Sequence, residues 1–71
     1  MSELQAPYLT EGQFYHTHNA TYQFLFSVTY EYSTLAILQD INTRLRIAVE
    51  MDIFVELIEQ GVYRLEHMVR E

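Results

Sequence analysis

The chain has 71 residues, of which 49% are hydrophobic and none is cysteine, and its formal net charge is −6. The lack of cysteine excludes disulfides and thiolate metal ligands, and the acidic balance disfavours nucleic acids and anionic membranes as partners. A chain this short buries only about 60% of its unfolded surface, so we expect one domain over residues 1–71 that gains stability as a homodimer.

Residues 1–12 include the one proline, Pro7, and show no hydrophobic periodicity, which predicts a loose N-terminal arm. The arm lacks the positive region and apolar run of a secretion signal. No stretch approaches the roughly 20 apolar residues that a membrane-spanning helix needs. We therefore expect a cytoplasmic protein, in a cell or in an infected host.

Residues 21–32 alternate between two kinds of side chain, the pattern of a strand with one buried face. Residues 13–18 alternate weakly and predict a second strand, joined through a turn at 18–20 to make a hairpin. Twelve extended residues span about 40 Å, whereas a compact chain of this length measures about 30 Å across. The strand must therefore bend at a bulge or be covered by a second chain. Its aromatic side comprises Tyr22, Phe24, Phe26, Val28, Tyr30 and Tyr32.

Residues 34–49 support two interpretations. Leu35, Leu38, Ile41 and Leu45 lie at helical spacing, which predicts a helix over this range. Residues 44–51 also alternate cleanly, with Leu45, Ile47, Val49 and Met51 on one side and Arg44, Arg46, Ala48 and Glu50 on the other. That pattern indicates a strand preceded by a turn at 40–42.

A second helical stripe begins after Asp52 and predicts a C-terminal helix over residues 53–70. Its centre is rotated away from the earlier stripe, so we expect a break near residues 50–52, with Asp52 as the N-cap. Gly61 would lie in the middle of this helix, where it costs about 1 kcal/mol relative to alanine, and we expect it to mark a close crossing.

The fold class is therefore α+β: a small antiparallel sheet built on strand 21–32, followed by one or two helices. The order strand, helix, helix resembles the layout of ribbon-helix-helix repressors, which implies an intertwined dimer and, as an alternative function, DNA binding. The strand carries none of the basic residues that such a ribbon uses against phosphate. The residues expected at the dimer interface are Tyr22, Phe24, Phe26, Val28, Leu57 and Leu65.

The composition is similar to that of small acidic proteins with which phages and plasmids block host enzymes. We therefore expect a protein-binding regulator or inhibitor of phage or mobile-element origin, whose partner has a basic surface. A structural subunit of a larger assembly is a further alternative. Tyrosines and acidic residues supply the expected partner surface: Tyr15, Tyr30, Tyr32, Glu50, Asp52, Glu56 and Glu59.

Catalytic and cofactor signatures are weak in this sequence. It has no cysteine or lysine nucleophile, no glycine-flanked serine and no glycine-rich phosphate loop, so we expect no enzyme activity and no cofactor. His16 and His18 would point to the same side of a strand, a spacing that can hold a metal if a third ligand approaches. Two histidines flanking a turn are the simpler interpretation.

Overall fold

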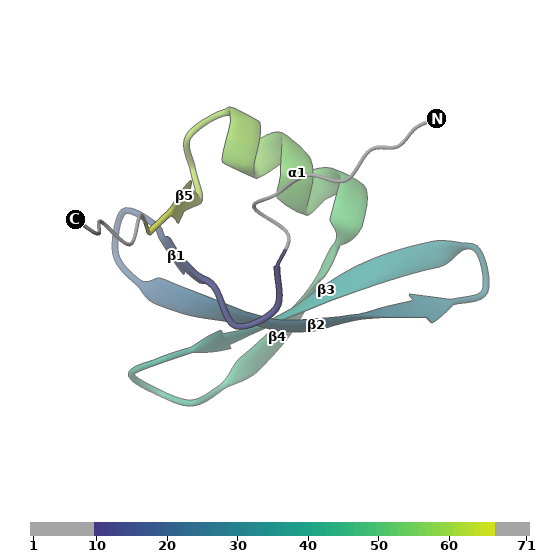
Figure 1. The fold of residues 1–71 in the computed structure, drawn as a ribbon, viewed down its shortest axis with the longest axis horizontal. Coiled ribbons are helices and arrows are strands. Elements are labelled where there is room, and N and C mark those ends of the chain that lie inside the picture. Colours follow the sequence, from purple (N-terminus) through teal and green to yellow (C-terminus); the bar gives the residue numbers. More distant parts are fainter. Residues whose placement is uncertain (1–9, 67–71) are drawn as a thin grey trace.

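The computed structural model describes residues 10–66, which form a five-stranded antiparallel sheet with one helix on it (Figure 1). The strand order is β4-β3-β2-β1-β5. The predicted α+β class, the antiparallel sheet and the first hairpin are confirmed. The expected arm falls largely on residues 1–9, which lie outside the described residues. The elements are β1 Phe14–His16, β2 Thr21–Tyr30, β3 Ser33–Asp40, β4 Arg46–Glu50, α1 Met51–Glu59 and β5 Arg64–Leu65.

Helix α1 lies over one face of the sheet and places an aromatic side chain at the centre of the core (Figure 1). Phe54 is fully buried and meets Tyr15 of β1, Phe24 of β2 and Tyr63 at ring-centroid distances of 5.1, 6.1 and 5.2 Å. The pairs that Phe54 makes with Tyr15 and Tyr63 are edge to face, an arrangement that adds stability beyond the area that the rings bury. The core is therefore an aromatic cluster, completed from β3 by Ala36 and Leu38.

Strand β2 contains a β-bulge that divides its aromatic side between the two faces of the sheet. Phe24 pairs with Leu38 and Phe26 pairs with Ile37, which are consecutive residues of β3, so Leu25 is an extra residue with no partner in that strand. Directly opposite residues share a face, and consecutive residues of β3 point to opposite faces. Phe24 therefore points toward α1, and Phe26 points away from it. The prediction of one continuous aromatic side was wrong because of this one residue.

Residues 34–49 belong to two strands, so the predicted helix over this range was wrong. The strand alternative for residues 44–51 is confirmed by β4, whereas β3 was not predicted. The turn between β3 and β4 also lies where the alternative placed it, and the Asp40 carboxylate accepts from the N–H groups of Asn42 (2.8 Å) and Thr43 (3.1 Å). Within strand β3, Ala36 and Leu38 point into the core, and the alternating residues Leu35 and Ile37 point to the other face of the sheet. The comparison with the strand-helix-helix layout fails for the same reason, because α1 is the one helix among residues 10–66.

Helix α1 is much shorter than the predicted helix over residues 53–70. The expected break near residues 50–52 is confirmed, but Glu50 occupies the N-cap position without a side-chain bond, and Asp52 lies in the first turn. Gly61 ends the helix with φ of +84°: its N–H bonds the Ile58 carbonyl at 3.1 Å, and the Val62 N–H bonds the Leu57 carbonyl at 2.9 Å. These two bonds define a Schellman motif. Gly61 is thus a helix stop and not a mid-helix crossing point.

Among residues 10–66 there is no helix that is long and apolar enough to span a membrane.

Candidate protein-binding surface

The face of the sheet turned away from α1 carries a group of apolar side chains, here called the open-face patch. Their shared orientation follows from the pairs Phe26–Ile37, Val28–Leu35 and Ile37–Ala48. Phe26 is 37% exposed and Val28 is 41% exposed, and both lie on the part of β2 that pairs with β3 alone. The patch comprises Phe26, Val28, Tyr30, Leu35, Ile37 and Ala48.

Such a surface departs from the usual pattern of an antiparallel sheet. When one face is packed and the other faces water, the water-facing side chains are normally polar. A contiguous exposed apolar group surrounded by polar residues marks a site of interaction with another molecule. We therefore take the open-face patch as the candidate functional site.

Polar side chains border the patch on the side of the β3–β4 turn. Arg46 Nε donates to Gln39 Oε1 at 2.9 Å, and Gln23 is the residue of β2 opposite Gln39. All three occupy the same face as the patch, because Gln39 pairs with both Gln23 and Arg46. An apolar centre with a polar rim is the usual anatomy of a protein–protein interface.

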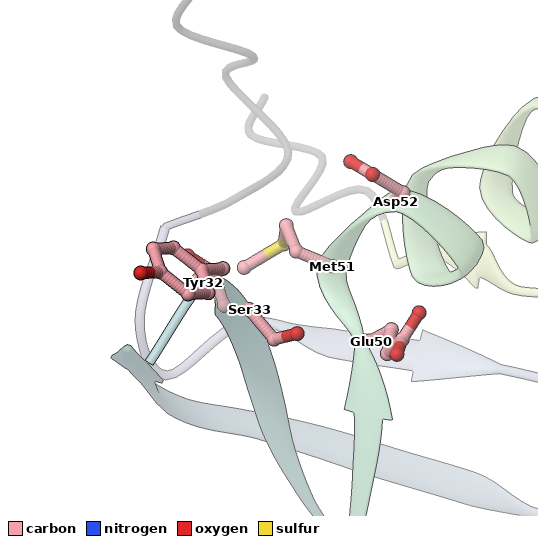
Figure 2. A pocket seen from close by; sticks show the side chains of 6 residues that line it. Tyr32, Ser33, Glu50, Met51 and Asp52 are labelled. Carbon is pink, nitrogen blue, oxygen red and sulfur yellow. The ribbon is translucent and has the colours of Figure 1, made fainter. Parts of the chain in front are cut away.

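An acidic pocket of about 210 Å³ borders the patch at the other end. Figure 2 shows Tyr32, from the β2–β3 turn, and Met51, from the start of α1, on two sides of this pocket. Glu50 connects the pocket to the patch, because Glu50 pairs with Leu35 and shares its face. The structure thus brings three of the predicted partner-binding residues together. The pocket is lined by Tyr32, Ser33, Thr34, Glu50, Met51 and Asp52.

The remaining predicted partner-binding residues are dispersed. Tyr30 is 68% exposed within the patch, and Glu56 and Glu59 are exposed on α1. Tyr15 is fully buried against Phe54, so its expected exposure was wrong. Tyr15 lies opposite Tyr22, so its side chain points toward α1. The prediction failed because the weak alternation of residues 13–18 did not indicate which face of β1 is buried.

The residues predicted for a dimer interface divide into two groups. Phe24 is buried in the core of its own chain, and Tyr22, Leu57 and Leu65 pack against that core. These four side chains are therefore used within the chain. Phe26 and Val28 remain on the open face, because they follow the bulge. The homodimer itself stays a prediction.

His16 makes two polar contacts through its ring. Nε2 lies 2.7 Å from Glu66 Oε1 and donates to that carboxylate, and Nδ1 lies 2.8 Å from Thr21 Oγ1. His18 is exposed in the turn that follows β1. Within residues 10–66, no group of three or more His, Cys, Asp or Glu side chains is placed to hold a metal ion. The contact with Glu66 was missed because residue 66 was assigned to a helix.

Half of the open-face patch escaped the sequence analysis for a similar reason. Leu35 was assigned to the helical stripe and Ile37 lay within the predicted helix over residues 34–49, whereas the strand alternative had already placed Arg46, Ala48 and Glu50 on one side. That alternation was the signal that locates the β4 part of the surface. No family model matches the sequence, and neither any curated protein nor any solved structure matches the chain.

Proposed function

We propose that this chain is a binding protein that buries its open-face patch against another protein and thereby regulates or inhibits it. The observation that carries the proposal is the exposure of the apolar side chains Phe26 and Val28 on the outer half of β2, where β2 pairs with β3 alone. Exposed apolar area is worth about 25 cal/mol per Å² when a partner removes it from water. Aromatic side chains within such a surface are typical binding hot spots, and the patch contains two of them, Phe26 and Tyr30.

Charge supports a protein partner with a basic region. The chain carries a net charge of −6 and contains no lysine, which opposes binding to phosphate backbones. The acidic pocket places Glu50 and Asp52 beside the apolar patch. A basic side chain on the partner would be steered toward this end, which would fix the orientation of the complex.

The double substitution Phe26→Ser with Val28→Ser tests the apolar half of the proposal. The matched control is Ile53→Ser with Val62→Ser, which removes two aliphatic side chains of similar exposure (47% and 45%) outside the patch. Tagged protein of each kind would be used for affinity capture from an extract of the organism that encodes it. We expect the parent and the control variant to capture the same protein and the patch variant to capture none of it. The three circular dichroism spectra should be the same, which shows that all three proteins are folded. Equal capture by the folded patch variant would overturn the proposal.

The single substitution Asp52→Lys tests the electrostatic half, since Asp52 is an exposed residue of the pocket. We expect slower association with the captured partner and a weaker dependence on salt, because electrostatic steering acts mainly on the association rate. The comparison variant is Glu59→Lys, which makes the same charge change at the far end of α1. If both variants associate at the rate of the parent, the basic region of the partner is not required.

A further inference from the structure

Strand β4 forms a free edge that is long for so small a sheet. It has five residues and, within residues 10–66, pairs only with β3, whereas the opposite edge strand β5 has two residues. Long free edges present unpaired N–H and C=O groups to other chains, and proteins usually protect them. Three features that commonly protect an edge, namely proline, lysine and a bulge, are absent from Arg46–Glu50.

The hydrogen-bonding pattern shows which backbone groups this edge presents. The Asp40 N–H donates to the Leu45 carbonyl at 2.9 Å, so these two residues form a bonded pair at the start of the β3–β4 ladder. Bonded and non-bonded pairs alternate along an antiparallel ladder. Ile47 and Val49 therefore bond to β3. Arg46 and Ala48 direct their N–H and C=O groups toward the free edge. Glu50 directs its N–H there, whereas its C=O, at the N-cap of α1, accepts the first bond of the helix.

We propose that β4 pairs with β4 of a second copy of this chain, antiparallel and across a two-fold axis at Ala48. In this register, Ala48 faces its own counterpart, and Arg46 faces Glu50 of the partner copy at both ends. The N–H and C=O of Ala48, and at each end the Glu50 N–H and the Arg46 C=O, are already directed outward for this exchange of backbone bonds. A two-fold interface requires a self-complementary surface, and the segment Arg46–Glu50 provides one.

Charge selects this register over its neighbours. Opposite charges directly across a strand pair contribute about 0.2–1 kcal/mol, and like charges there are destabilising. A shift by two residues in either direction places Arg46 or Glu50 opposite Ala48, so that within Arg46–Glu50 no opposite charges face each other. A parallel arrangement brings Arg46 beside Arg46 and Glu50 beside Glu50. Only the antiparallel register about Ala48 pairs both charges of both copies.

Apolar contacts support the same arrangement on the other face. Ile47 points to the side of α1 because it pairs with Leu38, yet it remains 37% exposed. Across the proposed axis, Ile47 lies opposite Val49 of the partner copy, so the hydrophobic layer beneath each helix would continue into the other. On the open face, the two patches would meet at Ala48. The edge pairing does not depend on the proposed function, although it would join two binding surfaces into one.

A charge exchange on the full chain provides the sharpest test, with self-association measured by sedimentation equilibrium. Arg46→Glu or Glu50→Arg alone places like charges opposite each other at both ends, and we expect dimerisation about tenfold weaker or worse. An equimolar mixture of the two variants restores both pairs, so we expect the heterodimer to exceed either homodimer. The double variant should regain the affinity of the parent. A mixture that associates no better than its components would overturn the proposal.

A backbone substitution tests the register independently of charge. Proline is tolerated where an edge-strand N–H faces solvent, so Ala48→Pro should leave a folded monomer that no longer dimerises. Ile47→Pro is the control, because the Ile47 N–H bonds to β3 and the loss of that bond should unfold the chain.

A monomeric parent at millimolar concentration, or a dimer that survives Ala48→Pro, would refute the pairing. A dimer lost only with Phe26→Ser and Val28→Ser would place the second copy on the open-face patch instead. Partner capture by a monomeric parent would leave the proposed function standing.

Discussion

The rings of Tyr15 and Phe54 meet edge to face, with centroids 5.1 Å apart and planes inclined by 70°. This contact joins the first strand to the helix, and both side chains are fully buried. Because α1 has only nine residues and one fully buried side chain, its attachment to the sheet depends strongly on Phe54.

Phe54→Ala should therefore remove most of the stability of the domain. Truncating a buried phenylalanine costs about 3–5 kcal/mol, which is comparable to the whole stability of a small domain. Urea unfolding followed by far-ultraviolet circular dichroism measures the change. Ile53→Ala, at the neighbouring exposed position, is the control and should change the free energy of unfolding by less than about 1 kcal/mol. Similar losses in both variants would contradict the central role of Phe54.

Deletion of Leu25 should be tolerated. The residue is the extra one of the bulge, so its removal leaves Phe24 opposite Leu38 and Phe26 opposite Ile37 in a regular ladder, with each side chain on its present face. Deletion of Ile37 from the adjacent regular strand should instead abolish the fold, because one half of β3 must then exchange its faces. Amide proton dispersion in NMR spectra distinguishes the two results. An unfolded Leu25 deletion would show that the bulge is required for folding.

Gly61→Ala should lower the free energy of unfolding by about 1 kcal/mol, because Gly61 has φ of +84° and an alanine there is strained. Nothing lies within 4 Å of the position that the new methyl group would occupy, so the loss would reflect the backbone alone. Gly61→Asn is the control and should lose less, since asparagine adopts this conformation more readily. Thermal unfolding of the three proteins provides the comparison.

Arg44→Gly should stabilise the chain by a few tenths to about 1 kcal/mol. Arg44 has φ of +68°, and its N–H bonds the Asp40 carbonyl while Asp40 bonds Leu45, a bulge geometry that favours glycine. Arg44→Ala removes the same side chain but keeps the strained backbone, so it should bring no gain. Denaturant midpoints at constant slope measure both effects. A gain in stability in both variants would show that the change arises from the loss of the Arg44 charge.

Stability should fall above pH 10 through Tyr63. Burial, and next the electrostatic effect of Tyr22, raises the pKa of Tyr63 above its ordinary value of 10.0. As the pH passes 10, the unfolded chain loses this proton before the folded chain does, which favours unfolding. Tyr63→Phe removes this contribution. The difference in stability between parent and variant should be constant below pH 10 and should shift in favour of the variant above it.

The sequence predicted those parts of the fold in which local pattern and tertiary structure agree. The alternation in residues 21–30, the turn after His16 and the turn at Asp40 all follow from residue types at their positions. The helix over residues 34–49 was wrong because the consecutive apolar residues Leu35 to Leu38 fit either period. Only pairing with β2 on one side and β4 on the other decides between them.

The sequence predicted several residues of the candidate site from their type, but it did not predict where the fold places them. Tyr32, Glu50 and Asp52 were selected as exposed aromatic and acidic residues, and the fold brings them to one pocket. The open-face patch was not predictable as a surface, because a bulge has no clear sequence signal when the inserted residue is leucine. Phe26 and Val28 were expected beside Phe24, and a single extra residue moves them to the opposite face.

The pairing of β1 with β5 has a consequence for the order in which the chain folds. The strands β1 to β4 are neighbours both along the chain and in the sheet, so each can pair with its predecessor as soon as it is made. Strand β5 instead returns to the first strand, with the Glu66 N–H bonding the Phe14 carbonyl across 52 residues. Contacts of such separation form slowly because the loop must close first. We therefore expect β1 to remain an open edge during synthesis until residues 64–66 leave the ribosome.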